Sequence, residues 1–450
     1  MSRFSSSFVL TAATAMVAGS MLAPAAAFAD VSSDLPQEQV AAVVEAGTVY
    51  LSGTWSGFVN YPTPDGGTAW SDAVDASFSC SGFVASSDGY IVTAGHCADV
   101  AEGKTALVDQ FLSNEVTNGD ITSDDAQGYL AGGAESNWPV EGQQSGAAPV
   151  LAMKVYPAIT ITGDTAAGYP AVLQDDRPIS QGDVALFKID TPSPLPVLLV
   201  SPNQPSTGQK VDAVGYPGNV SGLVSGNPQP TFAQGLVSGR QQTAGGPFTQ
   251  IGVAMSPGMS GGPVVNGQGD VLGTVSFGPS NDTQQLNFAA APETITALLT
   301  RSGVKNTLSD VDTLYRKGLN EYFSGRYHDA AADLGTVVSR DPSNAIAQQY
   351  QTKAIAAFPQ EDTTPWLLIF VLGGVALLVV ILVVVLLLVL AARRRRRRGA
   401  VVGAPVVAAG YGAVAPIPVP GAAPAATPAA PAEPGVSQAP EASVGPVSEQ

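Results

Sequence analysis

Short apolar runs separated by turn-forming residues fill the chain from residue 30 to about residue 302. Clusters of Gly, Pro, Asn and Asp separate the runs, a pattern typical of β-strands joined by tight turns. Helical periodicity is visible only at 37–46 and 292–302. We therefore predict an antiparallel all-β barrel or sandwich, with long surface loops in the Gly- and Asp-rich stretch 98–181. The clearest strand-like runs are 90–92, 184–187, 211–214 and 271–277.

Residues 309–358 have a helical pattern instead. Their small and large residues recur close to the spacing of a tetratricopeptide (TPR) repeat, in which small residues let two antiparallel helices approach. Only one repeat and a following helix at 344–357 are present, so we expect the segment to lean on the barrel, a partner or a second copy. A docking surface and a stalk both remain open as its role. The motif positions are Leu314, Gly318, Tyr322, Gly325, Tyr327, Ala330, Leu334, Val337 and Pro342.

An apolar run without charged residues occupies 366–392, and six arginines at 393–398 follow it. About 20 apolar residues suffice to cross a bilayer, and arginines favour its cytoplasmic side. We therefore predict a single-pass transmembrane helix at 366–392 in the cell membrane, with the N-terminal domain extracellular. The Ala- and Pro-rich stretch after the arginine run, up to residue 450, indicates a disordered cytoplasmic tail.

Residues 1–29 have the features of a secretory signal peptide: Arg3, then an apolar stretch, then the small-x-small sequence Ala-Phe-Ala at 27–29. An exported chain matures in an oxidising compartment, so we expect Cys80 and Cys97, the only cysteines, to form a disulfide. Two reduced, buried thiols are the alternative. We expect no metal site, because two cysteines and one nearby histidine fall short of the four ligands of zinc.

The formal net charge is −17 at pH 7. This charge disfavours nucleic acid and acidic partners. The arginine run does not change that view, because its position beside a membrane span accounts for it. We expect no nucleic acid and no cofactor, and we expect a protein or peptide, together with the membrane, as partners.

A histidine and a serine lie in two short frames, His96 in Thr-Ala-Gly-His-Cys and Ser260 in Gly-Met-Ser-Gly-Gly-Pro. A serine hydroxyl is a weak nucleophile until a base removes its proton, so such a pair is the minimum for acyl transfer. The only other histidine, His328, belongs to the helical segment, where we place it on the exposed side of the second helix. His96 is thus the single candidate for the base. A glycine-rich hairpin without chemistry is the alternative for the serine frame.

A third member of such a site would be a carboxylate that holds the histidine tautomer. Asp183 stands at the head of the apolar run 184–187, where it would be partly buried and need a partner. Asp164, Asp175 and Asp176 lie in more polar surroundings. The glycines around Ser260 permit a tight turn in which the N–H groups of Gly258 and Ser260 form an oxyanion hole.

These motifs resemble those of chymotrypsin-type (trypsin-like) serine peptidases, in the bacterial branch of HtrA-like and glutamyl-endopeptidase-like enzymes. The resemblance covers roughly residues 45–300 and implies two six-stranded antiparallel β-barrels with the site between them. It implies His96 as general base, Asp183 as its orienting carboxylate, Ser260 as nucleophile, and a disulfide that closes the loop before the histidine. The matching segments are 81–84, 91–97, 182–188, 214–218, 235–238 and 258–263.

Two departures from the family pattern matter. Met259 replaces the aspartate that, in the digestive branch, pairs with a newly cut N-terminal amine. Activation through that salt bridge cannot operate, so we expect either that removal of the signal peptide suffices or that another contact controls the loop. The PDZ domain usual in HtrA-like enzymes is replaced by the helical segment and the membrane run, so chaperone-type assembly is not carried over.

For specificity, the resemblance implies that residues 254–257, including Ala254 and Ser256, line one wall of the S1 pocket. It also implies that Ser276 to Gly278 pair with the substrate backbone as an added strand. The predicted pocket base has no carboxylate for Arg or Lys, and the chain has no spare histidine for Glu. We therefore expect a small or medium apolar P1 residue.

The sequence thus predicts a membrane-anchored extracellular serine endopeptidase that works through an acyl-enzyme. Its expected architecture is a mainly β, trypsin-like double barrel at 30–302, a small TPR-like segment at 309–358 and one transmembrane helix. A catalytically inactive peptidase-like scaffold that presents the helices to a partner is the alternative. A third hypothesis is a switch, in which a partner docked on 309–358 orders the loop around Met259.

Overall fold

The computed structural model describes residues 34–157, 168–218, 229–277, 287–342, 344–361 and 366–398. The expected signal peptide at 1–29, the tail at 399–450, Asp164 and Gly278 lie outside these residues. The chain divides into two compact units, Met1–Thr363 and Thr364–Gln450, and each is described by itself.

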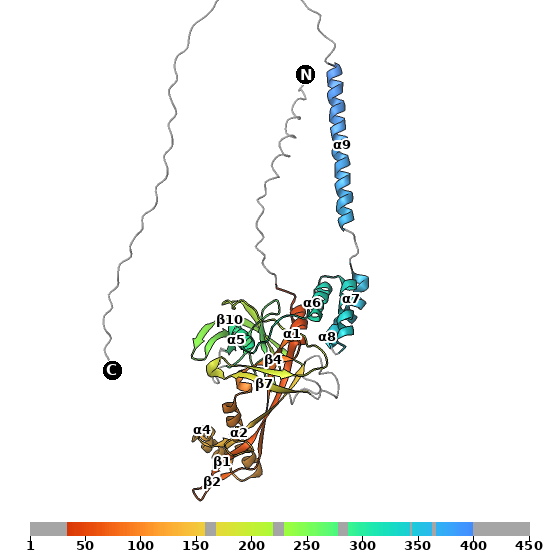
Figure 1. Ribbon diagram of the computed structural model, residues 1–450. Coiled ribbons are helices and arrows are strands. Elements are labelled where there is room, and N and C mark those ends of the chain that lie inside the picture. Colours follow the sequence, from red (N-terminus) through yellow and green to blue (C-terminus); the bar gives the residue numbers. More distant parts are fainter. Residues whose placement is uncertain are drawn as a thin grey trace, which may run out of the picture. The chain divides into compact units, whose positions relative to one another are not determined.

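The first barrel of unit 1 is a closed antiparallel sheet in the order β1-β3-β4-β8-β7-β6, with β6 pairing back onto β1. Side chains of β1 alternate between buried and partly exposed along most of its length, as a strand with one face on a core must. Two short strands, β2 and β5, extend the pairing of β1 beyond the barrel. Figure 1 shows β2 at the far end of β1. The strands are β1 (Thr48–Pro62), β2 (Thr68–Trp70), β3 (Val74–Ser86), β4 (Tyr90–Thr93), β5 (Val140–Glu141), β6 (Val150–Pro157), β7 (Tyr169–Arg177) and β8 (Val184–Ile189).

The second barrel is also closed, in the order β10-β11-β14-β13-β12-β9. It is followed by helix α5 (Pro292–Arg301), which packs on β8 and β13. The prediction of two six-stranded antiparallel barrels is therefore confirmed. The strands are β9 (Lys210–Gly215), β10 (Thr231–Thr243), β11 (Gly246–Ile251), β12 (Pro263–Val265), β13 (Val271–Val275) and β14 (Asn287–Ala290).

The expectation of long surface loops after residue 98 is wrong for the first part of that stretch, which folds into three helices, α2 (Val100–Asn118), α3 (Ser123–Ala131) and α4 (Ala134–Asn137). Asp99 caps α2 by accepting the N–H of Ala101, and Gly119 ends it in the left-handed conformation. The apolar side chains of α2 pack with Trp55 and its neighbours in a separate core beneath the extended end of β1. Burial against residues that are distant in the sequence, and not the local composition, therefore determines that this segment is helical.

Helix α1 (Gln37–Gly47) joins the barrels to the C-terminal helices α6 (Asp310–Phe323), α7 (Tyr327–Arg340) and α8 (Ala345–Ala357). The Tyr315 hydroxyl of α6 donates to the Ala42 carbonyl oxygen of α1 over 2.8 Å. The Asp312 carboxylate accepts the N–H of Val197 over 3.0 Å. One hydrophobic core runs from the first barrel through α1 into these helices. Of the three supports expected for the helical segment, the barrel is the one that the structure provides.

Two details of the helical segment agree with what its sequence predicts. A Cβ on Gly318 would lie 2.8 Å from Cγ of Leu334, so this glycine permits the close approach of α6 and α7. His328 is exposed, as expected, and pairs with Glu361 while stacking on Phe358.

Replacing Leu319 with alanine is expected to lower the free energy of unfolding of a 30–363 chain by about 2 to 5 kcal/mol, because this α6 side chain is 0% exposed in the shared core. Urea unfolding followed by tryptophan fluorescence measures this loss of stability. Trp55, Trp70 and Trp138 all lie outside the C-terminal helices α6 to α8, so their signal reports on the barrel part of the chain. The matched control is Leu236→Ala, a change at a leucine that is 49% exposed, which should leave the transition in place. If Leu319→Ala left the urea midpoint of the tryptophan transition unchanged, the result would contradict a core shared by the barrel and the C-terminal helices.

Unit 2 contains helix α9 (Trp366–Arg398), drawn in blue in Figure 1. Within it, Phe370–Arg395 is long and apolar enough to cross a membrane, by length and composition alone.

Candidate active site

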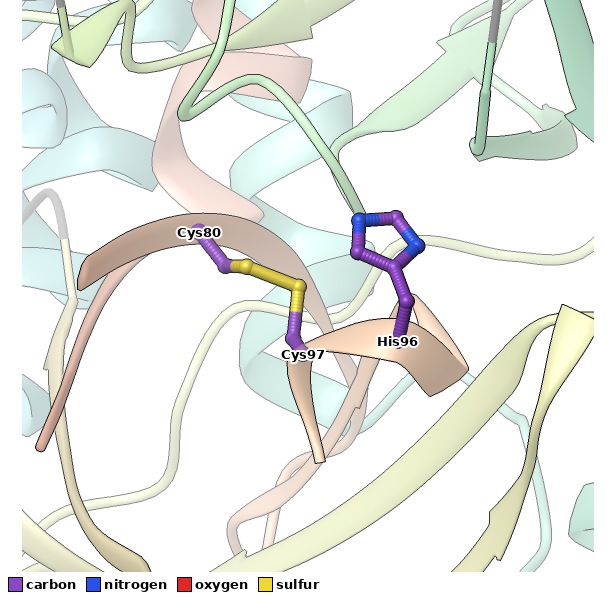
Figure 2. Close-up of side chains that lie close together, drawn as sticks. All are labelled: Cys80, His96 and Cys97. Carbon is purple, nitrogen blue, oxygen red and sulfur yellow. A yellow bond between two sulfur atoms is a disulfide. The ribbon is translucent and has the colours of Figure 1, made fainter. Parts of the chain in front are cut away.

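His96 lies on a single 3₁₀ turn, η1 (Gly95–Cys97), directly after β4. The turn needs Gly95, because a Cβ there would lie 1.8 Å from the carbonyl oxygen of Arg177 at the end of β7. Cys97 of the same turn forms the expected disulfide with Cys80 of β3, with their Cα atoms 6.5 Å apart. Figure 2 shows the imidazole of His96 projecting from this turn beside the disulfide. The turn that carries His96 is therefore fixed by close packing against the end of β7 and by the disulfide to β3.

The two cysteine sulfurs and the His96 ring lie close enough to suggest a metal-ligand cluster, within 4.8 Å of one another. Both sulfurs are used in the disulfide, so neither is a thiolate that could bind zinc. This donor set does not fit a metal ion.

Asp183 stands between the turn η3 (Ile179–Gln181) and β8, and its carboxylate is 0% exposed. It accepts the backbone N–H of His96 over 2.8 Å, and its two oxygens lie 3.1 and 3.0 Å from His96 Nδ1. The hydroxyl of Ser276 donates to the same carboxylate. These contacts hold the imidazole through Nδ1 and leave Nε2 for another partner.

The backbone of Asp183 has φ of 55°, and it is the one non-glycine residue with positive φ in the part of the chain that the structure describes. Aspartate tolerates this left-handed conformation better than most residues. Such strain persists where the surroundings over-determine it and is common at functional sites. Here the buried hydrogen bonds to His96 and Ser276 fix the residue.

The charges of this pair favour an ionised aspartate beside a histidine that binds its proton more tightly. Burial alone would raise the pKa of Asp183, but the hydrogen bonds and charge of His96, with the Ser276 hydroxyl, lower it below its ordinary value. Burial alone would lower the pKa of His96, but Asp183, with the charges of Glu102 and Asp99, outweighs it and raises the pKa above 6.5. The imidazole is 23% exposed, so solvent and ligands reach it.

Ser260 lies in a turn at 257–261, between β11 and β12, in which the carbonyl oxygens of residues 257–260 all accept hydrogen bonds. The carbonyl oxygen of Pro257 accepts the N–H of Gly218 over 2.7 Å, and that of Met259 accepts the N–H of Gly262 over 3.0 Å. The N–H of a trans peptide points opposite to its carbonyl group, so the N–H groups of Gly258 and Ser260 point away from these anchors. Neither N–H has an acceptor within the described ranges. Two unpaired donors in one turn can receive an oxyanion.

This turn packs directly against the segment that leads into His96. A Cβ on Gly261 would lie 2.1 Å from Thr93 Oγ1 and 2.5 Å from the nitrogen of Ala94, so only glycine fits. The N–H of Ser81, next to Cys80, donates to the Ser260 carbonyl oxygen over 2.8 Å. The structure thus brings the frames of His96 and Ser260, which are far apart in the sequence, to one junction between the two barrels.

The predicted substrate-binding residues occupy different environments. Ala254 is exposed and Ser256 partly exposed, as residues of a pocket wall can be. Ser276 is buried, and sequence reasoning missed the bond from its hydroxyl to Asp183. No local signal marks that role, because the two residues are 93 positions apart. Pairing of Ser276 with a substrate backbone stays a prediction.

Residues 80–273 match the family described as "Trypsin-like peptidase domain". The matched range contains His96, Asp183 and Ser260. Among solved structures, the crystal structure of the serine endoprotease from Yersinia pestis is similar at 18% identity, with a TM-score of 0.35 over 60% of this chain and 68% of that chain. No curated protein matches the chain.

Proposed function

We propose that this protein is a serine endopeptidase that hydrolyses peptide bonds through an acyl-enzyme. His96 is the general base, Asp183 orients it, Ser260 is the nucleophile, and the N–H groups of Gly258 and Ser260 bind the oxyanion. The trypsin-like peptidase domain at 80–273 supports a serine peptidase.

The observation that carries the proposal is the buried Asp183 carboxylate on His96. A carboxylate removed from water is costly unless it is paired and hydrogen-bonded. Three donors, the backbone N–H and Nδ1–H of His96 and the Ser276 hydroxyl, satisfy it. The arrangement fixes the tautomer in which Nε2 carries the lone pair, as a general base requires.

In the proposed reaction, His96 Nε2 takes the proton of the Ser260 hydroxyl as its oxygen attacks the scissile carbonyl carbon. The negative oxygen of the tetrahedral intermediate accepts hydrogen bonds from the two N–H groups of the turn, those of Gly258 and Ser260. Protonated His96 then gives its proton to the leaving amine, which departs and leaves the acyl-enzyme. His96 then takes a proton from a water molecule whose oxygen attacks the acyl carbon. The bond between this carbon and Ser260 Oγ breaks, the acid product leaves, and His96 returns the proton to Oγ.

We place the domain outside the cell, tethered by α9. The length and composition of Phe370–Arg395 support a membrane span, and the arginines at 393–398 favour a cytoplasmic C-terminal side. The proposed substrates are proteins or peptides at the cell surface, with a small or medium apolar residue at P1. The inactive scaffold is less well supported, because α6 and α8 use Tyr315, Leu319 and Tyr350 to pack into the shared core.

Covalent labelling with a fluorophosphonate tests the proposal on the full-length protein in detergent. These reagents phosphonylate an activated serine, so we expect one label per chain in the wild type and none in Ser260→Ala. Labelling of His96→Ala should be slowed by several orders of magnitude. A folded wild-type chain that takes no label, or labelling that survives Ser260→Ala, would refute the proposed function.

A further inference from the structure

Ser81 is a 0% exposed residue of β3 that joins three parts of the site. Its hydroxyl donates to the carbonyl oxygen of Gly258 over 2.7 Å and accepts the N–H of Tyr216, just after β9, over 2.8 Å. Its carbonyl oxygen accepts the hydroxyl of Thr93 over 2.7 Å, three residues before His96. One serine of the first barrel therefore contacts the turn at 257–261 of the second barrel and the strand that leads to the histidine.

The Ser81 hydroxyl completes the anchoring of that turn. Other groups hold the carbonyl oxygens of Pro257 and Met259, and the Ser81 backbone holds that of Ser260. The peptide between Gly258 and Met259 lies between the two oxyanion donors. Its N–H donates to the Ser256 carbonyl oxygen over 3.0 Å, and the Ser81 hydroxyl is the partner of its carbonyl oxygen from the other barrel. Gly258 has φ of +94°, a conformation from which glycine rotates with little steric resistance. Without the Ser81 bond, only the contact with nearby Ser256 orients this peptide, so the peptide plane and the neighbouring N–H groups lose the restraint from the first barrel.

The apolar side chain of Met259 explains why the turn needs the hydrogen bond from Ser81 in this chain. Its side chain is buried in the core of the second barrel, among Val211, Val253 and Val264. That packing holds the turn by apolar contact, which is not directional. A hydrogen bond is directional, so it can set the orientation of a peptide plane where packing cannot.

We infer that the Ser81 hydroxyl is a positioning group for the oxyanion hole, and that together with the buried Met259 it preforms the turn without a salt bridge. This inference rests on the proposed function. Because Ser81 belongs to the first barrel and Gly258 to the second, the oxyanion hole is formed only when the two barrels are docked.

Steady-state kinetics of Ser81→Ala in the full-length protein test the inference, with kcat expressed per active site titrated by the fluorophosphonate. We expect kcat to fall about 10- to 100-fold while KM stays within about threefold, because the loss falls on the transition state. The affinity of a peptide boronic acid, which binds serine as a tetrahedral adduct, should fall in parallel with kcat. The pH at the midpoint of the acid limb should not move, because His96 and Asp183 keep their contacts.

The matched control is Ser77→Ala on the same strand, whose exposed hydroxyl pairs only with Thr54 among the described residues and should leave kcat unchanged. Ser81→Thr keeps the hydroxyl and should restore most of the rate. Gly215→Ala perturbs the same junction from β9 and serves if Ser81→Ala does not fold. Its Cβ would lie 2.9 Å from Ser81 Oγ and 3.0 Å from Met259 Cα, so it disturbs both the hydroxyl and the turn that the hydroxyl holds.

A titrated kcat of Ser81→Ala, or of Gly215→Ala in its place, within twofold of the wild type overturns the inference and leaves the proposed function intact. If kcat fell by the expected factor of about 10 to 100 while the affinity for the boronic acid stayed unchanged, that result would also overturn the inference. A wild-type chain that neither labels nor hydrolyses peptides refutes the proposed function itself.

Discussion

Replacing Ser260 with alanine is expected to lower kcat/KM for a peptide substrate by about a million-fold, because the variant can form no acyl-enzyme. His96→Ala should cost about as much, since an unactivated hydroxyl is a poor nucleophile. The two residues act as one unit, so the double variant should be no slower than either single one. Release of a chromogenic amine from a peptide anilide measures all three.

The control for this experiment is Ser206→Ala, at an exposed serine in the segment before β9, which should keep full activity. Circular dichroism of each variant checks that the barrels remain folded. Losses that multiply in the double variant would show that His96 and Ser260 act independently, which is incompatible with a shared proton transfer.

Much of this fold is readable from local pattern. The runs at 90–92, 184–187, 211–214 and 271–277 coincide with β4, β8, β9 and β13, and the two helices expected at 37–46 and 292–302 are α1 and α5. These elements carry strong signals because each is a short apolar run bounded by turn residues, or a helix with one apolar face. Strand pairing follows less directly, and the family resemblance supplied the count of six strands in each barrel.

What the sequence did not predict depends on contacts between distant residues. Helices α2 to α4 were missed because their apolar faces are short and pack on an extension of β1 that has no local signature. Ser81 and Gly258 are 177 positions apart, and the bond between them gives neither residue an unusual neighbourhood in the sequence. His96, Asp183 and Ser260 could be proposed from the sequence because each residue type is tied to a chemical role. Positioning residues have no such mark.

The helical segment shows the same limit. Its motif spacing fits a TPR repeat, yet that spacing says nothing about which surface covers the repeat. In the structure Tyr315 and Tyr350 face α1, through bonds to Ala42 and Glu38. Assignment of the segment to the TPR family stays a prediction, whereas its packing on the double barrel is a property of the fold.

Asp183→Asn is expected to lower kcat by about ten-thousand-fold with little change in KM, because the amide can stabilise the wrong tautomer of His96. The variant should also shift the acid limb of the residual activity. Asp183 raises the pKa of His96, so in the wild type the neutral base accumulates only as the pH rises above 6.5. Loss of the carboxylate lowers that pKa, and the limb of kcat/KM against pH should move to lower pH.

Asp175→Asn is the matched control, because this nearby aspartate is bonded to Arg301 and not to His96. It should leave both the rate and the acid limb close to those of the wild type. If Asp175→Asn caused the large loss and Asp183→Asn did not, the carboxylate would be wrongly assigned. If Asp183→Asn lowered the rate without moving the limb, the buried carboxylate would act on the fold around Ser276 and not on the charge of the base. The pH profile therefore separates an electrostatic role of Asp183 from a structural one, which a rate at one pH cannot do.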